Sequence, residues 1–151
     1  LKKYIQNQSG EIVNSSGEKL GEHDGVMFYT IGQRKGLGIG AKNNNSTGAW
    51  YVLDKDIQNN ELIVCQGHDN PALYQKKITA SQTHWISGML PTKKKLNAKI
   101  RYRSNDIPCT ITEINNNKIF VIFENPCFAI APGQSIVFYD NDICLGGAII
   151  D

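Results

Sequence analysis

Closely spaced short segments rich in β-branched and aromatic residues fill the second half of the chain, and this pattern limits the possible folds most. Turn-forming residues at 115–117 and 140–142 separate neighbouring segments. Short strands at such spacing are typical of a small β-barrel or β-sandwich. Closure into a barrel removes the free strand edges that would otherwise pair with other chains. The sequence therefore predicts a mainly β fold, with candidate strands at residues 76–81, 96–103, 107–114, 118–124, 134–139 and 143–150.

The first half of the chain is richer in glycine and less regular. An apolar run at residues 25–31 fits a short helix or a buried strand, because periodicity does not separate the two at this length. The polar stretch 68–71 marks a linker, so we expect a small β-rich domain at 1–72 and a β-barrel domain at 73–151. The other expected elements of the first domain are a hairpin around residues 15–17 and a second hairpin of strands 50–54 and 61–65.

Composition restricts the class of protein further. Apolar residues make up 40% of the chain, which is enough for a core. The net charge of +2 excludes a histone-like polycation, so nucleic-acid binding would need local basic patches. No window approaches the roughly 18 apolar residues of a membrane span. Leu1 stands where an initiator Met is expected, and no signal peptide follows. We expect an excised part of a cytoplasmic protein that does not enter a membrane.

The cysteines show no CxxC spacing, so neither a zinc ribbon nor a redox pair is indicated. Cys65, Cys109 and Cys144 fall within apolar strand-like runs, where cysteine usually acts as a small buried hydrophobe. No histidines have metal-ligand spacing, and no carboxylate pair suggests acid–base catalysis. The sequence therefore predicts neither a catalytic centre nor a metal site within these residues.

The strongest chemical feature is the basic segment at residues 93–103. In a strand over 96–103 the side chains alternate, so Leu96, Ala98, Ile100 and Tyr102 share one face. The other face then presents a stripe formed by Lys99, Arg101 and Arg103, which residues 93–95 extend. Such a stripe is able to follow a phosphate backbone, although an ordinary solvated strand face gives the same pattern.

Four further residues are candidates for a functional role, and each also has a structural explanation. Arg34 and Lys35 lie in the glycine-rich segment 32–40, which lacks the surroundings of a dinucleotide or Walker A loop but is able to contact RNA phosphates. His23 is expected to serve a structural or capping role, because no nucleophile is evident for it. Gln134 follows Pro132-Gly133, a predicted turn that displays its amide to a nucleotide.

Several segments together resemble the bacterial tRNA-specific 2-thiouridylases. The resemblance covers nearly the whole chain in the order of the family, although Ala148 stands where relatives commonly have a third glycine. The matching segments are Gly21-Glu-His-Asp-Gly25, Tyr29-Thr-Ile-Gly-Gln-Arg-Lys-Gly-Leu-Gly-Ile39, Trp50–Asp56, Lys99–Arg103, Ile107–Cys109, Ala131–Gln134, Val137–Tyr139 and Cys144–Gly147.

The resemblance implies both a fold and a function. The family folds this region as a β-rich central domain followed by a six-stranded barrel like those of elongation factors. Its enzymes thiolate the wobble uridine of tRNA: ATP adenylates the uridine, and a cysteine persulfide then delivers sulfur. The ATP site and both catalytic cysteines are implied to lie upstream of Leu1, so this chain alone is expected to be inactive and to need no cofactor. Arg101, Tyr102 and Gln134 match tRNA-contacting positions of the family.

We further expect Arg103, Arg34 and Lys35 to contact tRNA. The expected partners are tRNA and, for the parent enzyme, a sulfur-donor protein; the chain itself is expected to be monomeric. Two other hypotheses remain open at this point. In the first, the chain is a module that docks a sulfur-donor protein. In the second, it is a small stand-alone enzyme, a hypothesis that only His23 and the glycine-rich segment support.

Overall fold

The chain divides into two compact units, Leu1–Leu73 and Tyr74–Asp151. A computed structural model describes residues 8–39, 48–93, 95–100 and 105–151. Among these residues, strands predominate and no helix combines the length and apolar character needed to cross a bilayer. The predicted mainly β class is thus confirmed.

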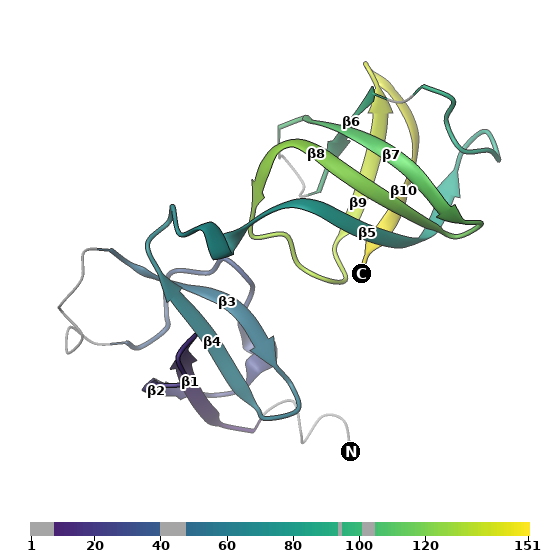
Figure 1. The fold of residues 1–151 in the computed structure, drawn as a ribbon. Helices are drawn as coiled ribbons and strands as arrows, with labels where there is room; N and C mark the ends of the chain where they lie inside the picture. The colour runs from purple at the N-terminus through teal and green to yellow at the C-terminus, as the bar shows by residue number, and fades with distance from the viewer. Residues whose placement is uncertain (1–7, 40–47, 94, 101–104) are drawn as a thin grey trace. The chain divides into compact units, whose positions relative to one another are not determined.

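The first unit is built on a four-stranded sheet with the order β2-β1-β4-β3 (Figure 1). β1 (Gly10–Asn14) and β2 (Lys19–His23) form the first predicted hairpin, and β3 (Trp50–Asp56) and β4 (Glu61–Gln66) form the second. Both hairpins are antiparallel, whereas β1 and β4 pair in parallel at the centre of the sheet. The parallel pairing joins segments that are far apart in the sequence, so it stabilises the unit as a whole.

One face of this sheet buries a small apolar core. Ile12, Val52, Leu62 and Val64 are fully buried, and Leu37 packs against them from the glycine-rich segment. In β4 the buried residues Leu62 and Val64 alternate with the half-buried Ile63, as expected for a strand with one covered face. The core therefore fixes the position of the chain around residues 32–38.

The apolar run 25–31, for which a short helix and a buried strand were both open, contains a short helical turn and no strand. It contains a single turn of 3-10 helix, η1 (Val26–Phe28), which begins after Gly25 at φ 147°. Val26 is buried, but Met27 and Phe28 are exposed. One short turn cannot direct all of these apolar side chains to the core.

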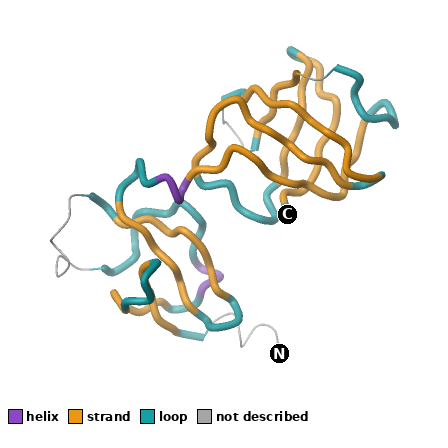
Figure 2. The backbone as a smooth tube through the Cα atoms, in the orientation of Figure 1, coloured by secondary structure: helices purple, strands orange, loops and turns teal. Residues whose placement is uncertain are grey.

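The second unit is a closed barrel of six strands, in the order β10-β5-β8-β7-β6-β9. Every neighbouring pair is antiparallel, and β9 pairs with β10 to close the ring (Figure 2). The six-stranded barrel predicted from the sequence is therefore confirmed. The 3-10 helix η3 (Pro71–Leu73) leads into the barrel strands, which are β5 (Tyr74–Trp85), β6 (Lys95–Lys99), β7 (Ile107–Asn115), β8 (Lys118–Phe128), β9 (Ser135–Asp140) and β10 (Ile143–Ile150).

The barrel interior is filled by side chains. Phe123 from β8 and Phe138 from β9 are completely buried, and Trp85 packs on Phe138 with ring centroids 5.7 Å apart. β6 differs from its prediction because the strand ends at Lys99 rather than continuing to residue 103. Ile100, which follows it, still packs against the barrel core. The predicted inward face at positions 96, 98 and 100 is therefore confirmed.

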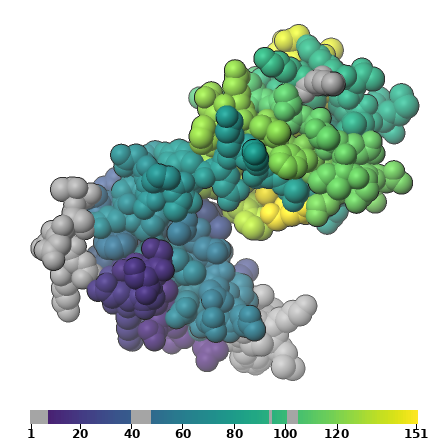
Figure 3. Space-filling model, in the orientation of Figure 1, coloured from purple at the N-terminus to yellow at the C-terminus, as the bar shows by residue number. Residues whose placement is uncertain are grey.

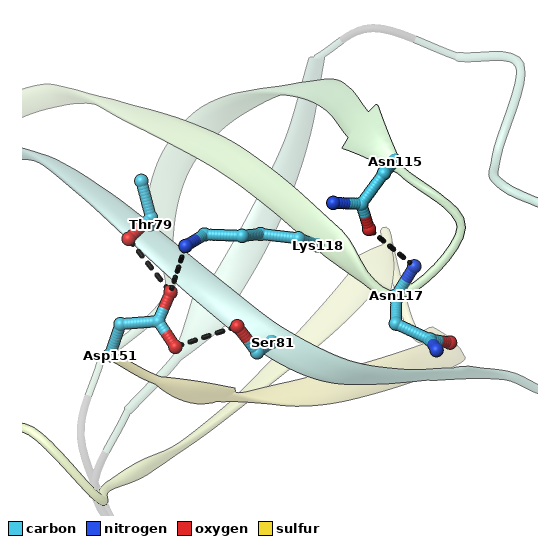
Figure 4. A network of polar contacts seen from close by, with 6 residues as sticks. All are labelled: Thr79, Ser81, Asn115, Asn117, Lys118 and Asp151. Carbon is cyan, nitrogen blue, oxygen red and sulfur yellow. Dashed lines mark hydrogen bonds and ion pairs between the residues drawn. The ribbon is translucent and has the colours of Figure 1, made fainter.

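A polar network fixes the end of β10 to the neighbouring strands (Figure 4). The hydroxyls of Thr79 and Ser81 on β5 donate to the Asp151 carboxylate at 2.8 and 2.6 Å. The Nζ of Lys118 on β8 lies 3.5 Å from the same carboxylate. These bonds favour the charged form, so they hold the pKa of Asp151 below its usual value of 3.8. The network therefore stabilises the barrel only while Asp151 is ionised.

Asp151→Asn is expected to lower barrel stability at neutral pH and to have progressively less effect in acid. The pKa of Asp151 is depressed in the folded state, so its contribution is present above the unfolded pKa and is lost as pH falls through the folded pKa. Urea titrations of the two proteins at a series of pH values measure this difference. Asp142→Asn, which alters an exposed turn residue, is the control. A difference between wild type and Asp151→Asn that stays constant down to about pH 2 would contradict the linkage.

Candidate nucleic-acid interface

The outer face of β6 carries the described part of the basic segment. Lys95 and Lys99 are exposed, whereas Leu96 and Ala98, which lie between them in the strand, are buried in the barrel. This two-residue alternation places the lysines on one outer face, as the sequence predicted. Lys93, which precedes the strand, forms an ion pair of 2.7 Å with Asp140 at the end of β9. Lys94 lies outside the described residues. The described lysines therefore form a cationic face along β6.

Lys99 is held in place by two contacts. Its Nζ lies 5.3 Å from the centroid of the Tyr139 ring, a cation–π contact. It also lies 3.6 Å from a carboxylate oxygen of Asp106. This ion pair joins the two ends of the stretch that contains Arg101, Tyr102 and Arg103. Those three predicted contact residues lie outside the described residues, so their role stays a prediction.

Gln134 lies in a tight turn at the same end of the barrel where the chain leaves β6. β9 runs antiparallel to β6, with Lys99 opposite Val137, so the turn before β9 is at that end. Gly133 has φ 89°, which confirms the predicted glycine turn. The Ala131 N–H donates to the Gln134 side-chain oxygen at 2.8 Å, and the Ile150 N–H donates to its backbone oxygen at 2.8 Å. The turn thus uses the acceptor half of the amide, and within the described part of the chain its N–H groups have no hydrogen-bond partner.

Arg34 and Lys35 are exposed in a turn of the first unit. Hydrogen bonds of the Gln33 side chain hold this turn in place. The Thr30 N–H donates to the Gln33 side-chain oxygen at 3.0 Å, and the Gln33 amide donates to the Lys35 carbonyl at 2.9 Å. The Val52 N–H donates to the Gln33 carbonyl at 2.9 Å, which ties the turn to β3. Both cations are therefore displayed by an ordered turn, and their contact with RNA stays a prediction.

His23 has a structural role, as the sequence indicated. Its side chain is buried, with 1% exposure. The Gly25 N–H donates to Nδ1 at 3.0 Å, and Nε2 lies 2.9 Å from the Asn60 carbonyl oxygen. A carbonyl only accepts and an amide N–H only donates, so Nδ1 is the acceptor and Nε2 the donor in these contacts. Both ring nitrogens are used within the fold, which argues against a catalytic base.

The cysteines are mainly structural. Cys65 and Cys109 are buried, as predicted, and burial raises the pKa of Cys109 to about 12, with a further contribution from the nearby Cys127. Burial also raises the pKa of the Cys65 and Cys127 thiols. Cys144 was predicted to be buried, but it is exposed because β10 shifts register between Cys144 and Gly146. Within the described ranges, no group of three His, Cys, Asp or Glu side chains is placed to hold a metal.

The structure adds two residues that sequence reasoning did not place near the basic segment. Tyr139 on β9 lies opposite Asn97 of β6, beside Lys99. Lys76 on β5 borders the same outer groove as Lys95. Tyr139 comes close to β6 because β9 pairs with β6, and Lys76 lines the same groove from β5. The sequence offers no signal for this pairing, since the strands concerned are separated by others.

Comparison with known proteins agrees with this architecture. A family model described as an aminomethyltransferase beta-barrel domain matches residues 75–150. A second, described as a tRNA methyl transferase PRC-barrel domain, matches residues 1–66. Together the two models define the class: a protein with two β domains that follow one another in the sequence, of which the second is a closed barrel. The first model covers the closed barrel of β5 to β10, and the second covers the four-stranded sheet.

Curated relatives identify the family more closely. The chain is 47% identical over 156 residues to the tRNA-specific 2-thiouridylase MnmA of Salmonella typhimurium, covering 100% of this chain and 41% of the relative. It is 51% identical over 152 residues to that of Haemophilus influenzae, covering 99% and 39%. It is 48% identical over 151 residues to that of Francisella philomiragia, covering 99% and 42%. The chain belongs to the tRNA-specific 2-thiouridylase family, and it spans about two fifths of the length of these relatives.

Proposed function

We propose that residues 1–151 form the tRNA-holding part of a cytoplasmic tRNA-specific 2-thiouridylase. In this proposal ATP-dependent activation of the wobble uridine, and sulfur transfer to it, take place in another part of the protein. ATP and the sulfur-donor protein are thus assigned to that other part, and residues 1–151 alone do not thiolate tRNA. The observation that supports the proposal most is the similarity of the whole chain to 2-thiouridylases. The chain is proposed to act as a monomer within one enzyme molecule.

The chemistry of the barrel surface is suited to this role. Lys95 and Lys99 stand on one outer face of β6, and the Gln134 turn lies at the barrel end toward which that face runs. Lysine ammonium groups bind phosphate oxygens as point charges, and an amide N–H is able to donate to a phosphate, ribose or base. We assign tRNA contacts to Arg101, Tyr102 and Gln134, with Arg103, Arg34 and Lys35 as further contacts.

Arg101→Ala is expected to weaken tRNA binding by about 3–10-fold at low salt, because it removes one charge-assisted contact with phosphate. Electrophoretic retention of tRNA by residues 1–151 measures this effect. Lys19→Ala is the matched control, since Lys19 is a surface cation of the first unit that pairs with Glu22 at 3.2 Å. Equal retention by the wild type and Arg101→Ala would show that this segment is not the tRNA contact.

A second candidate function, docking of a sulfur-donor protein, is favoured by a group of exposed apolar side chains on the barrel. Ile86, Met89 and Ile143 are 66%, 70% and 66% exposed. The Ile86 N–H donates to the Leu145 carbonyl at 2.9 Å, so the turn after β5 adjoins the start of β10. Adjoining apolar residues on a surface commonly mark a protein contact. A complex with a persulfide-carrying protein that forms without RNA and survives high salt would favour this function over RNA binding.

A further inference from the structure

A groove of about 580 Å³ crosses the outer wall of the barrel. It lies over β6, β7 and β8, and β5 and β9 supply its two sides. Figure 3 shows one side of this barrel, where side chains of β5 (teal) and of β7 and β8 (green) cover the wall. The volume falls within the range of about 300–1,000 Å³ that is typical of pockets for small molecules. The groove is therefore large enough for one ligand unit rather than only for water.

The strand register shows that the groove is a continuous feature of the wall. Lys95 of β6 lies opposite Thr110 of β7, and Thr110 lies opposite Ile122 of β8. Two residues further along β6, on the same face, Asn97 lies between Tyr139 of β9 and Pro108 of β7. All of these residues line the groove. Regular pairing thus holds the lining residues at fixed positions on a rigid sheet.

The groove combines an apolar floor with a cationic border. Pro108, Tyr139 and the 37% exposed Ile122 supply apolar and aromatic surface. Lys76 and Lys95 are exposed, and neither has an ion-pair partner among the described residues. A third groove lysine, Lys93, already neutralises Asp140 at 2.7 Å. Glu124 is the remaining acid of the lining, so the groove carries a net positive charge.

We infer that this groove binds one unpaired nucleotide of the RNA, with its base on Ile122, Pro108 and Tyr139 and its phosphate at Lys76 and Lys95. The inference rests on the proposed function. Every base has an apolar face that is able to stack on aromatic or aliphatic side chains, and each phosphate carries a negative charge that lysines bind. Thr110 and Asn97 add hydroxyl and amide groups that are able to bond a base edge. A free nucleotide shares this chemistry, and the experiment below separates the two sources.

The test uses isotope-labelled residues 1–151 titrated with uridine 5′-monophosphate, uridine or inorganic phosphate, followed by amide NMR shifts. We expect saturable shifts at Asn97, Thr110 and Ile122 for the nucleotide, with a dissociation constant on the order of 1 mM. Uridine and phosphate alone are each expected to bind at least about 3-fold more weakly, because each offers half of the recognised chemistry.

Two pairs of variants locate the site. Thr110→Trp fills the groove without changing charge and is expected to abolish the nucleotide-induced shifts. Thr112→Trp, an exposed position two residues further along β7 that does not line the groove, is the matched control. Lys76→Ala is expected to weaken nucleotide binding by about 3–10-fold, whereas Lys19→Ala, which removes a surface cation of the first unit, is expected to leave it unchanged. Amide spectra of each variant establish that the barrel is folded.

RNA binding by the same variants decides the source of the nucleotide. We expect Thr110→Trp, but not Thr112→Trp, to weaken binding of the tRNA anticodon stem–loop by about 3–10-fold. Loss of uridine monophosphate binding with unchanged RNA binding would assign the groove to free nucleotides and overturn the inference. Nucleotide-induced shifts at lysines outside the groove would also overturn the inference. If the wild type still binds RNA in that case, the proposed function stands. Absence of RNA binding by the wild type would instead count against the proposed function.

Discussion

Gly146→Ala is expected to destabilise the barrel by about 2–6 kcal/mol, the sum of backbone strain and steric overlap at a single position. Gly146 has φ 146°, a backbone conformation that residues with a Cβ rarely adopt. A Cβ at this position would overlap the His84 carbonyl oxygen and would lie 2.9 Å from the Cα of Trp85. These are backbone atoms of the paired strand β5, so they cannot move aside without breaking the β5–β10 pairing.

The barrel is followed by tryptophan fluorescence during urea unfolding. The chain has two tryptophans, Trp50 in the first unit and Trp85 in the barrel, so a Trp50→Phe background leaves Trp85 as the reporter. Gly133→Ala is the matched control, because Gly133 has φ 89° but nothing lies within 4 Å of its added Cβ. Gly133→Ala is expected to destabilise the protein only by backbone strain, by about 1–3 kcal/mol. Equal unfolding midpoints for the two variants would contradict the proposed overlap at Gly146.

Positions 147 and 148, which follow Gly146 in β10, show how local backbone geometry decides where glycine is required. Ala148, the position where the family resemblance implied a third glycine, has its side chain buried in the barrel. Gly147, in contrast, lies where a Cβ would come within 2.7 Å of the Ile136 carbonyl oxygen. Within β10, close backbone contacts therefore require glycine at positions 146 and 147, beside the register shifts. The departure at position 148 is consistent with an unchanged barrel.

The barrel strands were predictable because each one carries its own signal. Short runs rich in β-branched and aromatic residues mark β7, β8 and β9, and Asn and Asp residues mark the turns that follow β7 and β9. Cys144 was misjudged because a register shift breaks the two-residue period at the start of β10. The sequence does not decide between a helix and a strand at 25–31, because seven residues are too few to show a periodicity, and the structure has one 3-10 turn there.

The candidate site was only partly predictable, because its residues come from strands that are distant in the sequence. The outer face of β6 followed from alternation alone, and Lys95 and Lys99 are exposed as expected. The proximity of Tyr139 and Lys76 depends on the order of strands around the closed ring. The β6–β9 pairing that places Tyr139 beside Lys99 joins strands separated by β7 and β8. Strand patterns alone specify which residues face outward, but not which strands become neighbours.

The double charge reversal Lys95→Glu/Lys99→Glu is expected to weaken tRNA binding by about 100-fold at 50 mM salt. Each substitution removes a cation from the outer face of β6 and places an anion where the phosphate backbone is proposed to lie. Lys99→Glu also removes the cation over the Tyr139 ring and the ion pair with Asp106. The effect should therefore exceed that of Arg101→Ala, which only removes a charge.

The salt dependence of binding separates loss of phosphate contacts from loss of folding. Each phosphate contact contributes about 0.7–0.9 to the slope of log K against log salt concentration, so the double variant should show a slope smaller by roughly 1.4–1.8. Lys19→Glu/Lys55→Glu makes the same change in net charge on the first unit and serves as the control. Because net charge is equal in the two variants, a larger loss for the β6 variant must come from where the charges lie. Equal losses of tRNA affinity and equal salt-dependence slopes would instead show that binding depends only on the net charge of the chain. The β6 face would then not be the tRNA contact.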